Sequence, residues 1–484
     1  MKVSRIQISL LLVINFLFAA NNSAQEYLQK YYPETDPLVS KQLEKWQDIK
    51  FGLLMHWGPY SQRGIVESWS ICSEDEGWCE RKTENYVEYK KDYENLKKTF
   101  NPTKFDPDKW AAAAKDAGMK YVIFTTKHHD GFCMFDTKQT DYKITDKETP
   151  FSTNAKANVT KEIFNSFHKN GFMTGAYFSK PDWHSENYWW PYFATPDRNV
   201  NYQIKKYPDR WKKFVEFTHN QIIELMTDYG RVDILWLDGG WVRIKTDEEV
   251  KEQMLSASFA MRPQSQDINM PELVRKAREK QPGLIVVDRA VEGPYQNYLT
   301  PENQVPGKLL PYPWESCIIM GGGWSYAFNA KYKSSHEVIH MLVDIVAKGG
   351  NLLLNIAPSA EGVWDEGAYE TLKGVGKWMK INSEAIYNSR PILPYQDGKI
   401  SYTQNRNDKT VYAIYLAEKT ETDFPTQIKL SANVITEKSV VSLLGTKIKL
   451  SLKKVEDGYI AETPKSIQKN LPCESAWVLK ITEK

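Results

Sequence analysis

Short apolar runs that end in polar residues recur along most of this 484-residue chain, at residues 51–58, 121–130, 174–183, 232–240, 284–290 and 351–359. Each run has the length of a strand and is rich in branched or aromatic residues. The runs are too uniformly apolar for strands with one face in water, so they predict a parallel sheet buried on both sides.

Helical patterns separate these runs, at residues 108–117, 161–169, 210–229, 271–280 and 336–348. Glycine often follows them, as a helix C-terminus favours. Alternating strands and helices of this number predict an α/β fold, a TIM-type (β/α)-barrel over residues 25–390. Residues 242–280 exceed a simple connection and predict an inserted helical loop.

The pattern changes near Ser389-Arg390-Pro391, after which apolar and polar residues alternate and Asp-Gly turns appear. Such alternation is typical of half-buried antiparallel strands. We therefore predict a C-terminal antiparallel β-sandwich over residues 391–484.

The first residues predict a secretory signal peptide over residues 1–24. Lys2 and Arg5 precede an apolar run from Ile8 to Ala20, and the segment ends in small residues at Ser23-Ala24. Its removal reduces 63 Lys and Arg to 61, equal to the 61 Asp and Glu. The signal peptide indicates an exported protein, periplasmic or secreted. A neutral chain without a basic block is not expected to bind nucleic acid. The lack of a second long apolar run predicts no membrane association once the signal peptide is removed.

Five cysteines in so long a chain do not form a disulfide scaffold. Cys72 and Cys79 are close enough in sequence to bridge in an oxidising compartment, or to remain two thiols.

Asp238 ends one apolar run and stands close to Trp236 and Trp241. An Asp followed by glycine is often a turn residue. At the mouth of a barrel, among aromatic rings that stack on sugar faces, a carboxylate also suits attack on a sugar C1.

A glycosidase needs a second carboxyl group to protonate the leaving oxygen. Glu292, Glu302 and Glu315 follow in the sequence. Glu302 lies in a loop beyond a predicted strand, and Glu315 opens another apolar run. The spacing alone does not choose between these two.

Three of the eight histidines follow predicted strands: His56, His128 and His129. They predict a polar pocket that binds hydroxyl groups. His128 and His129 can share one ligand only if the strand has ended before them, because adjacent strand residues face opposite ways. Trp324, beside a glycine-rich loop, is either a core residue or a ring that closes over the substrate.

His336-Glu-Val-Ile-His340 matches the zinc-hydrolase helix pattern H-E-x-x-H. Ser334 and Ser335 look like N-caps, and the following apolar residues indicate core packing. We therefore favour a barrel helix whose histidines cap or pack, with a zinc hydrolase as the alternative.

With these residues assembled, the chain resembles the α-L-fucosidases of glycoside hydrolase family 29. The similarity runs from about Trp46 to Ile386, on six motifs in order: Phe51-Gly-Leu-Leu-Met-His-Trp-Gly58, Thr126-Lys-His-His-Asp-Gly-Phe132, Gly175-Ala-Tyr-Phe-Ser179, Ile234-Leu-Trp-Leu-Asp-Gly239, Asp288-Arg289 and Gly349-Gly-Asn-Leu-Leu-Leu-Asn355.

The resemblance implies that the barrel is an irregular (β/α)8-like (TIM-type) barrel. It also implies a retaining enzyme without metal or other cofactor, with Asp238 as nucleophile and Glu302, in Thr300-Pro-Glu302, as acid/base rather than Glu315. It implies fucose contacts at His56, Glu67, His128, His129, Tyr177, Trp236, Arg289 and Trp324. Glu67 and Trp69 are separated by Ser68, where relatives often have them adjacent.

The implied activity is exo-hydrolysis of terminal α-L-fucose from fucosylated oligosaccharides or glycoconjugates by double displacement, in a monomer or a homo-oligomer. The two carboxyl groups should lie roughly 5–5.5 Å apart, the retaining distance. The alternative from another class is a fucose-binding or glycan-binding protein that no longer hydrolyses its ligand.

Overall fold

Seven parallel strands form the first sheet of the computed structural model, which describes residues 30–72, 79, 81, 85–256, 262–464, 466–467 and 471–483. The strands are β1 (Phe51–Met55), β2 (Tyr121–Lys127), β3 (Met173–Ser179), β4 (Ile234–Asp238), β5 (Ile285–Asp288), β6 (Glu315–Ile319) and β7 (Asn351–Asn355). Their spatial order is β5-β4-β3-β2-β1-β7-β6. The six predicted strands are therefore present, and β6 is an additional one.

The barrel closes through an irregular segment, residues 295–303, between β5 and β6. Gln296 forms an antiparallel bridge with Val287, while Leu299 and Glu302 form parallel bridges with Trp314 and Cys317. The segment occupies the place of an eighth strand without forming a continuous ladder. The predicted irregular barrel is confirmed, and Glu302 lies on its irregular seam.

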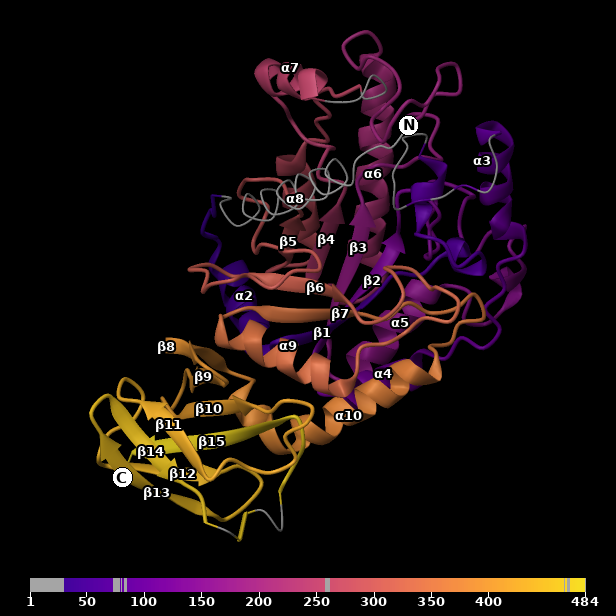
Figure 1. Cartoon of the computed structure of the whole chain (residues 1–484). Helices are drawn as coiled ribbons and strands as arrows, with labels where there is room; N and C mark the ends of the chain where they lie inside the picture. Colours follow the sequence, from indigo (N-terminus) through magenta and orange to yellow (C-terminus); the bar gives the residue numbers. More distant parts are fainter. Residues whose placement is uncertain are drawn as a thin grey trace, which may run out of the picture.

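Most of the helices cover the outer face of the barrel, and one lies in the loop beyond the end of β4 (Figure 1). They are α2 (Pro37–Ile49), α3 (Tyr86–Glu94), α4 (Pro107–Asp116), α5 (Val159–Lys169), α6 (Pro208–Asp228), α7 (Asp247–Ser256), α8 (Met270–Lys280), α9 (Ser335–Ala347) and α10 (Glu366–Asn382). Ser334 and Glu337 form a capping box that fixes the start of α9. The helix α8 is the regular crossover into β5, so the inserted loop is shorter than expected, and its described residues contain the helix α7.

The C-terminal strands form an antiparallel sandwich: β8 (Ser389–Asp397), β9 (Ile400–Asn405), β10 (Val411–Leu416), β11 (Gln427–Ser431), β12 (Ser439–Leu443), β13 (Lys449–Val455), β14 (Gly458–Glu462) and β15 (Ala476–Glu483). The order is β11-β14-β13-β12-β15-β10-β9-β8. The start of β13 pairs with β12, and its remainder pairs with β14. This strand passes from one layer to the other, and residues such as Leu430 and Leu479 fill the space between them.

Helices α9 and α10 lie between the barrel and the sandwich (Figure 1). The Asp48 carboxylate binds Arg390 and Arg406 of the sandwich at 2.8 and 3.0 Å. Trp378 Nε1 donates a hydrogen bond to the Ala476 carbonyl at 2.8 Å. The buried sandwich residue Ile414 belongs to the same apolar cluster as the barrel core, so the two parts share a core.

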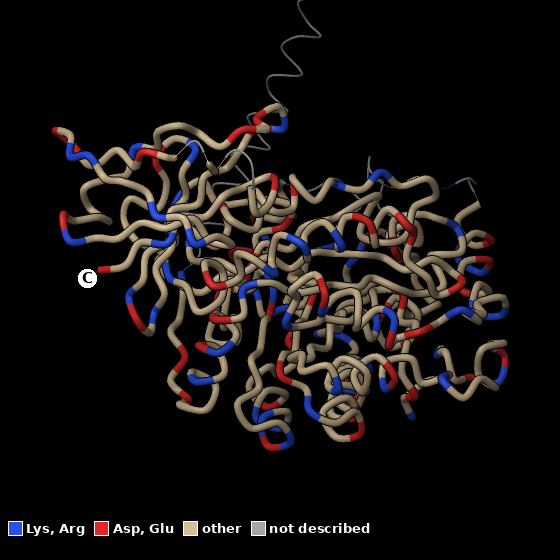
Figure 2. The backbone as a smooth tube through the Cα atoms, turned by 90° about the horizontal axis from the view of Figure 1, so that it is seen from below, with Lys and Arg blue, Asp and Glu red and all other residues tan. Residues whose placement is uncertain are grey.

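Basic and acidic residues are interspersed along both parts (Figure 2), as the balanced charge of the sequence suggests. Among the helices of the described chain, none combines the length and the apolar character that membrane crossing requires. The predicted signal peptide lies outside the described residues, and the two alternatives for Cys72 and Cys79, a bridge or two thiols, both stay predictions.

Candidate active site

A cavity of about 550 Å³ lies at the carboxyl ends of the barrel strands. It is lined by all ten residues that the sequence singled out: His56, Glu67, His128, His129, Tyr177, Trp236, Asp238, Arg289, Glu302 and Trp324. They come from strands and loops spread over most of the barrel sequence. Sequence positions far apart therefore converge on one hollow because parallel strands end at the same face.

Asp238 ends β4, and its carboxylate is held from three sides. Tyr177 donates its hydroxyl to Oδ2 at 2.7 Å, Arg289 donates to Oδ1 at 3.1 Å, and His129 Nε2 lies 3.9 Å from Oδ2. Burial alone would raise the pKa of Asp238, but Arg289, His129 and Tyr177 together hold it well below its ordinary value. The group is an anion over the whole working pH range of a protein.

Arg289 joins Asp238 to Glu302. One terminal nitrogen of the guanidinium binds Asp238, and the other binds Glu302 Oε2. Trp324 Nε1 donates to the second oxygen of Glu302 at 2.9 Å. The Glu302 side chain remains 39% exposed, so it faces both the cavity and solvent.

Glu315, the alternative acid, lies underneath the cavity rather than in it. Its side chain is fully buried and accepts hydrogen bonds from the Tyr121 hydroxyl at 2.7 Å and from Trp236 Nε1 at 3.3 Å. Burial raises the pKa of Glu315 to about 8. Glu315 supports the floor formed by Trp236 and has no path to a ligand above that ring.

The histidines line one side of the cavity. Because β2 ends at Lys127, His128 and His129 lie beyond the strand, and both face the cavity with ring centres 4.2 Å apart. His56 Nδ1 lies 3.0 Å from Asn355 Oδ1 at the end of β7. Burial lowers the pKa of His56 to about 4 and that of His129 to about 3, so these rings are neutral hydrogen-bonding groups.

Glu67 is a second, very different carboxyl group in the cavity. It is 1% exposed, and its Oε1 has no hydrogen-bond partner within the described part of the chain. Burial raises the pKa of Glu67 to about 8, against backbone hydrogen bonds from Ser325 and from Glu67 itself. The intervening Ser68 does not remove Glu67 from the site. At neutral pH Glu67 is protonated and is able to donate a hydrogen bond to a ligand.

Aromatic rings form the remaining wall. Tyr177 and Trp236 stack at 5.2 Å, and Trp324 lies 5.3 Å from the His56 ring. The Asn355 side chain donates to the Trp324 carbonyl at 2.8 Å, which fixes the glycine-rich loop. The interpretation of Trp324 as a cavity residue, rather than a core residue, is therefore the one the structure supports.

The sequence did not indicate Arg198, which also lines the cavity. Its guanidinium lies over the Trp69 ring at 4.9 Å and over the Trp241 ring at 5.4 Å. Arg198 belongs to a long loop between β3 and α6, away from any strand end. No periodicity or motif marks it in the sequence.

His128, His129 and Asp238 carry potential ligand atoms within 4.8 Å of one another. Both oxygens of Asp238 are already engaged, one by Tyr177 and one by the Arg289 guanidinium. A divalent cation there would be repelled by Arg289 and would have to displace these bonds. The donor set fits a hydrogen-bonding site better than a metal site.

The H-E-x-x-H helix is separate from this cavity. Glu337 caps its own helix, and His340 Nε2 contacts the Ser475 carbonyl of the sandwich at 2.8 Å. His336 and His340 border a shallow surface hollow that also contains Lys333 and Lys419. The helix caps and packs, which confirms the interpretation favoured by its N-caps.

Comparison with known proteins agrees with this geometry. A family model described as Alpha-L-fucosidase matches residues 17–384, and one described as Alpha-L-fucosidase C-terminal domain matches residues 395–482. The chain is 27% identical over 477 residues to the plasma alpha-L-fucosidase of Pongo abelii, covering 94% of this chain and 93% of that protein. It is 27% identical over 401 residues to the alpha-L-fucosidase of Dictyostelium discoideum, covering 80% of each.

Among solved structures, alpha-L-fucosidase isoenzyme 1 from Paenibacillus thiaminolyticus superposes with a TM-score of 0.72 at 27% identity, covering 92% of this chain and 100% of that one. A GH29 alpha-L-fucosidase from Bacteroides thetaiotaomicron gives a TM-score of 0.69 at 24% identity, covering 94% and 98%. Because the first family model alone spans well over half of the sequence, and the second spans the sandwich, the chain belongs to the alpha-L-fucosidase family, glycoside hydrolase family 29.

Proposed function

We propose that this chain is an exo-acting, retaining α-L-fucosidase in which Asp238 is the nucleophile and Glu302 the acid/base. The observation that carries the proposal is the Arg289 guanidinium, which contacts both carboxylates within one cavity of about 550 Å³. A hollow of this size suits a single terminal sugar with its aglycone directed outward.

In the first step, Asp238 attacks the anomeric carbon and Glu302 protonates the departing oxygen, which yields a fucosyl ester and a free aglycone. In the second step, Glu302 takes a proton from water, the water oxygen attacks the anomeric carbon, and Asp238 leaves. Tyr177 and Arg289 keep Asp238 ionised for the attack. The exposed side of Glu302 allows water to reach it.

The remaining cavity residues suit recognition of L-fucose. Its three hydroxyls meet neutral His56, His128 and His129 and protonated Glu67, and its C6 methyl meets the rings of Trp236 and Trp324. Buried polar groups would be left unpaired by a sugar that lacks a matching hydroxyl. Such sites reject incomplete analogues by large factors.

Hydrolysis of an aryl α-L-fucoside, followed by proton NMR, tests the proposal. We expect α-L-fucose as the first-formed product and a loss of several orders of magnitude in kcat for Asp238→Ala, since nucleophile removal in hydrolases costs on that order. β-L-Fucose as first product, or an active Asp238→Ala variant, would contradict it.

The same assay separates the alternatives. A binding protein would retain L-fucose without turnover, and a zinc hydrolase would lose activity with a chelator and carry stoichiometric metal.

We also propose that the protein is exported, which rests on Lys2, Arg5 and the apolar run from Ile8 to Ala20. Amino-terminal sequencing of exported protein should begin near residue 25, whereas a mature protein that begins at Met1 would contradict cleavage.

A further inference from the structure

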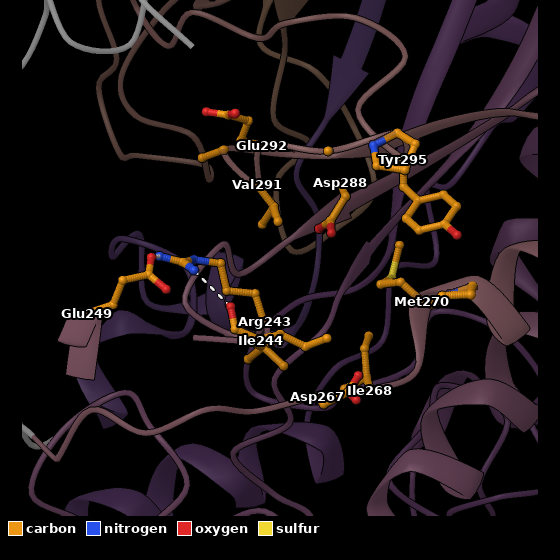
Figure 3. A pocket seen from close by; sticks show the side chains of 15 residues that line it. Arg243, Ile244, Glu249, Asp267, Ile268, Met270, Asp288, Val291, Glu292 and Tyr295 are labelled. Atoms are coloured by element: carbon orange, nitrogen blue, oxygen red, sulfur yellow. Dashed lines mark hydrogen bonds and ion pairs between the residues drawn. The ribbon is translucent and has the colours of Figure 1, made fainter. Parts of the chain in front are cut away.

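A second cavity, of about 600 Å³, lies outside the barrel wall between the end of β5, the start of α8 and the loop that follows β4. Figure 3 shows the Asp288 side chain directed into it, opposite Met270 and Ile268. Asp288 is the last residue of β5, and the next residue, Arg289, faces the active-site cavity instead. The two residues of the Asp-Arg motif therefore serve opposite faces of the wall.

Asp288 forms an ion pair with Lys180, the residue that follows β3. Asp288 Oδ1 contacts Lys180 Nζ, and the two side chains are only 4% and 0% exposed. Because β4 lies between β3 and β5 in the sheet, this pair spans the end of β4 on its outer side. Asp238, at that end of β4, lies between the two residues of the pair along the sheet.

Backbone bonds tie the same three strand ends together. Lys180 N donates to the Asp238 carbonyl at 2.9 Å, and Arg289 N donates to the Leu237 carbonyl at 3.1 Å. The residues that follow β3 and β4 can approach each other this closely because position 239 is glycine. A Cβ at that position would lie 2.3 Å from Pro181 Cδ. A shift of Lys180 or Asp288 is therefore transmitted directly to the residues that carry the two active-site charges.

We propose that Lys180 and Asp288 form a positioning pair that holds the ends of β3, β4 and β5 so that Asp238 and Arg289 meet in the reactive arrangement. The inference rests on the proposed function, because it assigns the pair a role in the attack by Asp238. Neither residue lines the active-site cavity among the described residues, so both act through their neighbours.

The first experiment compares Asp288→Asn with wild type on an aryl α-L-fucoside. The amide keeps the shape of the side chain but leaves the Lys180 charge unpaired. We expect kcat to fall by about 10- to 100-fold, as small misplacements of reacting groups cause. The inhibition constant of L-fucose should change by less than about threefold, because the sugar contacts on other strands remain.

Asp48→Asn is the matched control. Asp48 also forms ion pairs, with Arg390 and Arg406, but at the junction with the sandwich, where its side chain is partly exposed. We expect wild-type kcat in this control, together with a fall in Tm that shows the loss of its ion pairs. The double variant Lys180→Met with Asp288→Leu removes both charges, so it avoids an unpaired buried ion if Asp288→Asn fails to fold. It should fold and show the same loss of kcat.

A second experiment uses the outer cavity as a route to the ion pair. Asp288→Ala opens space beside Lys180, next to a cavity that formate can enter. We expect sodium formate, but not sodium chloride at equal ionic strength, to restore part of kcat, with α-L-fucose still the first product. The absence of fucosyl formate from the NMR spectrum distinguishes this rescue from formate acting as a substitute nucleophile, because a formate nucleophile would form that ester.

Wild-type kcat in Asp288→Asn or in the double variant would overturn the positioning pair. Parallel losses of kcat and of fucose affinity would also overturn it, because they indicate a general loosening of the site. An inactive wild type would instead overturn the proposed function, and this inference with it.

Discussion

Asp238 and Glu67 share one cavity, yet the protein shifts their pKa values in opposite directions. Arg289, His129 and Tyr177 hold the pKa of Asp238 down against its burial. Burial of Glu67 outweighs its backbone hydrogen bonds, and the nearby charges of Glu302 and Asp238 act in the same direction as burial, so the pKa of Glu67 is raised to about 8. Two carboxyl groups with opposed environments are typical of sites that need one anion and one neutral donor.

The pKa of Glu67 predicts how fucose binding depends on pH. Below about pH 8 Glu67 is neutral, and above it a new anion appears beside Asp238 and Glu302. We expect the inhibition constant of L-fucose to rise by at most about tenfold per pH unit above pH 8, the limit for one titrating group. Glu67→Gln stays neutral and should remove this dependence, whereas an unchanged pH profile in Glu67→Gln would contradict it.

The choice of Glu302 as acid/base predicts a selective chemical rescue. Glu302→Ala should lose about 10²–10⁴ in kcat, the usual contribution of a general acid/base, and lose less with a good leaving group. Azide should restore turnover and give fucosyl azide of retained configuration. Glu315→Ala is the control and should not respond to azide, because position 315 lies beneath Trp236. The reverse pattern would assign the role to Glu315.

At the scale of elements, the turn after β4 predicts a specific cost of adding one methyl group. Gly239 has φ +86°, and a Cβ there would clash with Pro181. Gly171 is the matched control, since its φ is +83° and nothing lies within 4 Å of its Cβ position. We expect Gly171→Ala to lower stability by about 1 kcal/mol with kcat unchanged.

Gly239→Ala should cost about 1–3 kcal/mol more, the range for overpacking a filled site, and should also lower kcat because the turn carries Asp238. Thermal unfolding and turnover of the two variants provide the measurement. Equal stability and equal kcat in both would show that the contact with Pro181 does not constrain the nucleophile.

Elements with a strong pattern could be predicted from the sequence, and those that break their pattern for a packing reason could not. The strand β6 begins with Glu315, and a charged residue is not expected inside a buried strand. Its burial is explained by hydrogen bonds from Tyr121 and Trp236, which the sequence does not reveal. The helix α10 contains three glycines, which lower helix propensity. One of them, Gly376, is needed because a Cβ there would lie 2.3 Å from the Asp116 carbonyl of α4.

The candidate site could be predicted where its residues belong to strongly patterned segments, and not elsewhere. Its ten predicted residues follow strands or belong to motifs, and parallel strands bring their ends together. Arg198 could not be predicted as a cavity residue because its loop has no periodic pattern and no motif. The burial of Glu315 beneath Trp236 could be seen only in the structure, because the distance along the sequence from Asp238 does not distinguish Glu315 from Glu302.

At the scale of the whole molecule, the barrel and the sandwich share buried surface although the cavity is built from the barrel alone among the described residues. Ile414 and Val478 pack into the barrel cluster, and Trp378 of α10 bonds to Ala476. A chain that ends at residue 388 would expose this face of α9 and α10.

We expect that truncated chain to be largely insoluble, or to unfold at a clearly lower temperature than the full chain. Soluble yield and thermal unfolding of the two chains provide the measurement. A truncated barrel with wild-type Tm would show that the shared core contributes little to the stability of the catalytic part.

The irregular closure of the barrel affects how glycan preference can change among related enzymes. The nucleophile Asp238 lies at the end of a strand that is paired on both sides, so substitutions around it are restricted by packing. The proton donor Glu302 lies in the irregular segment 295–303, which only isolated bridges connect to its neighbours. Insertions and exchanges between residues 304 and 313 can therefore remodel the loop that follows the proton donor while Glu302 and the fucose contacts stay in place. Swapping that stretch between relatives is a direct route to new glycan preferences on an unchanged fucose pocket.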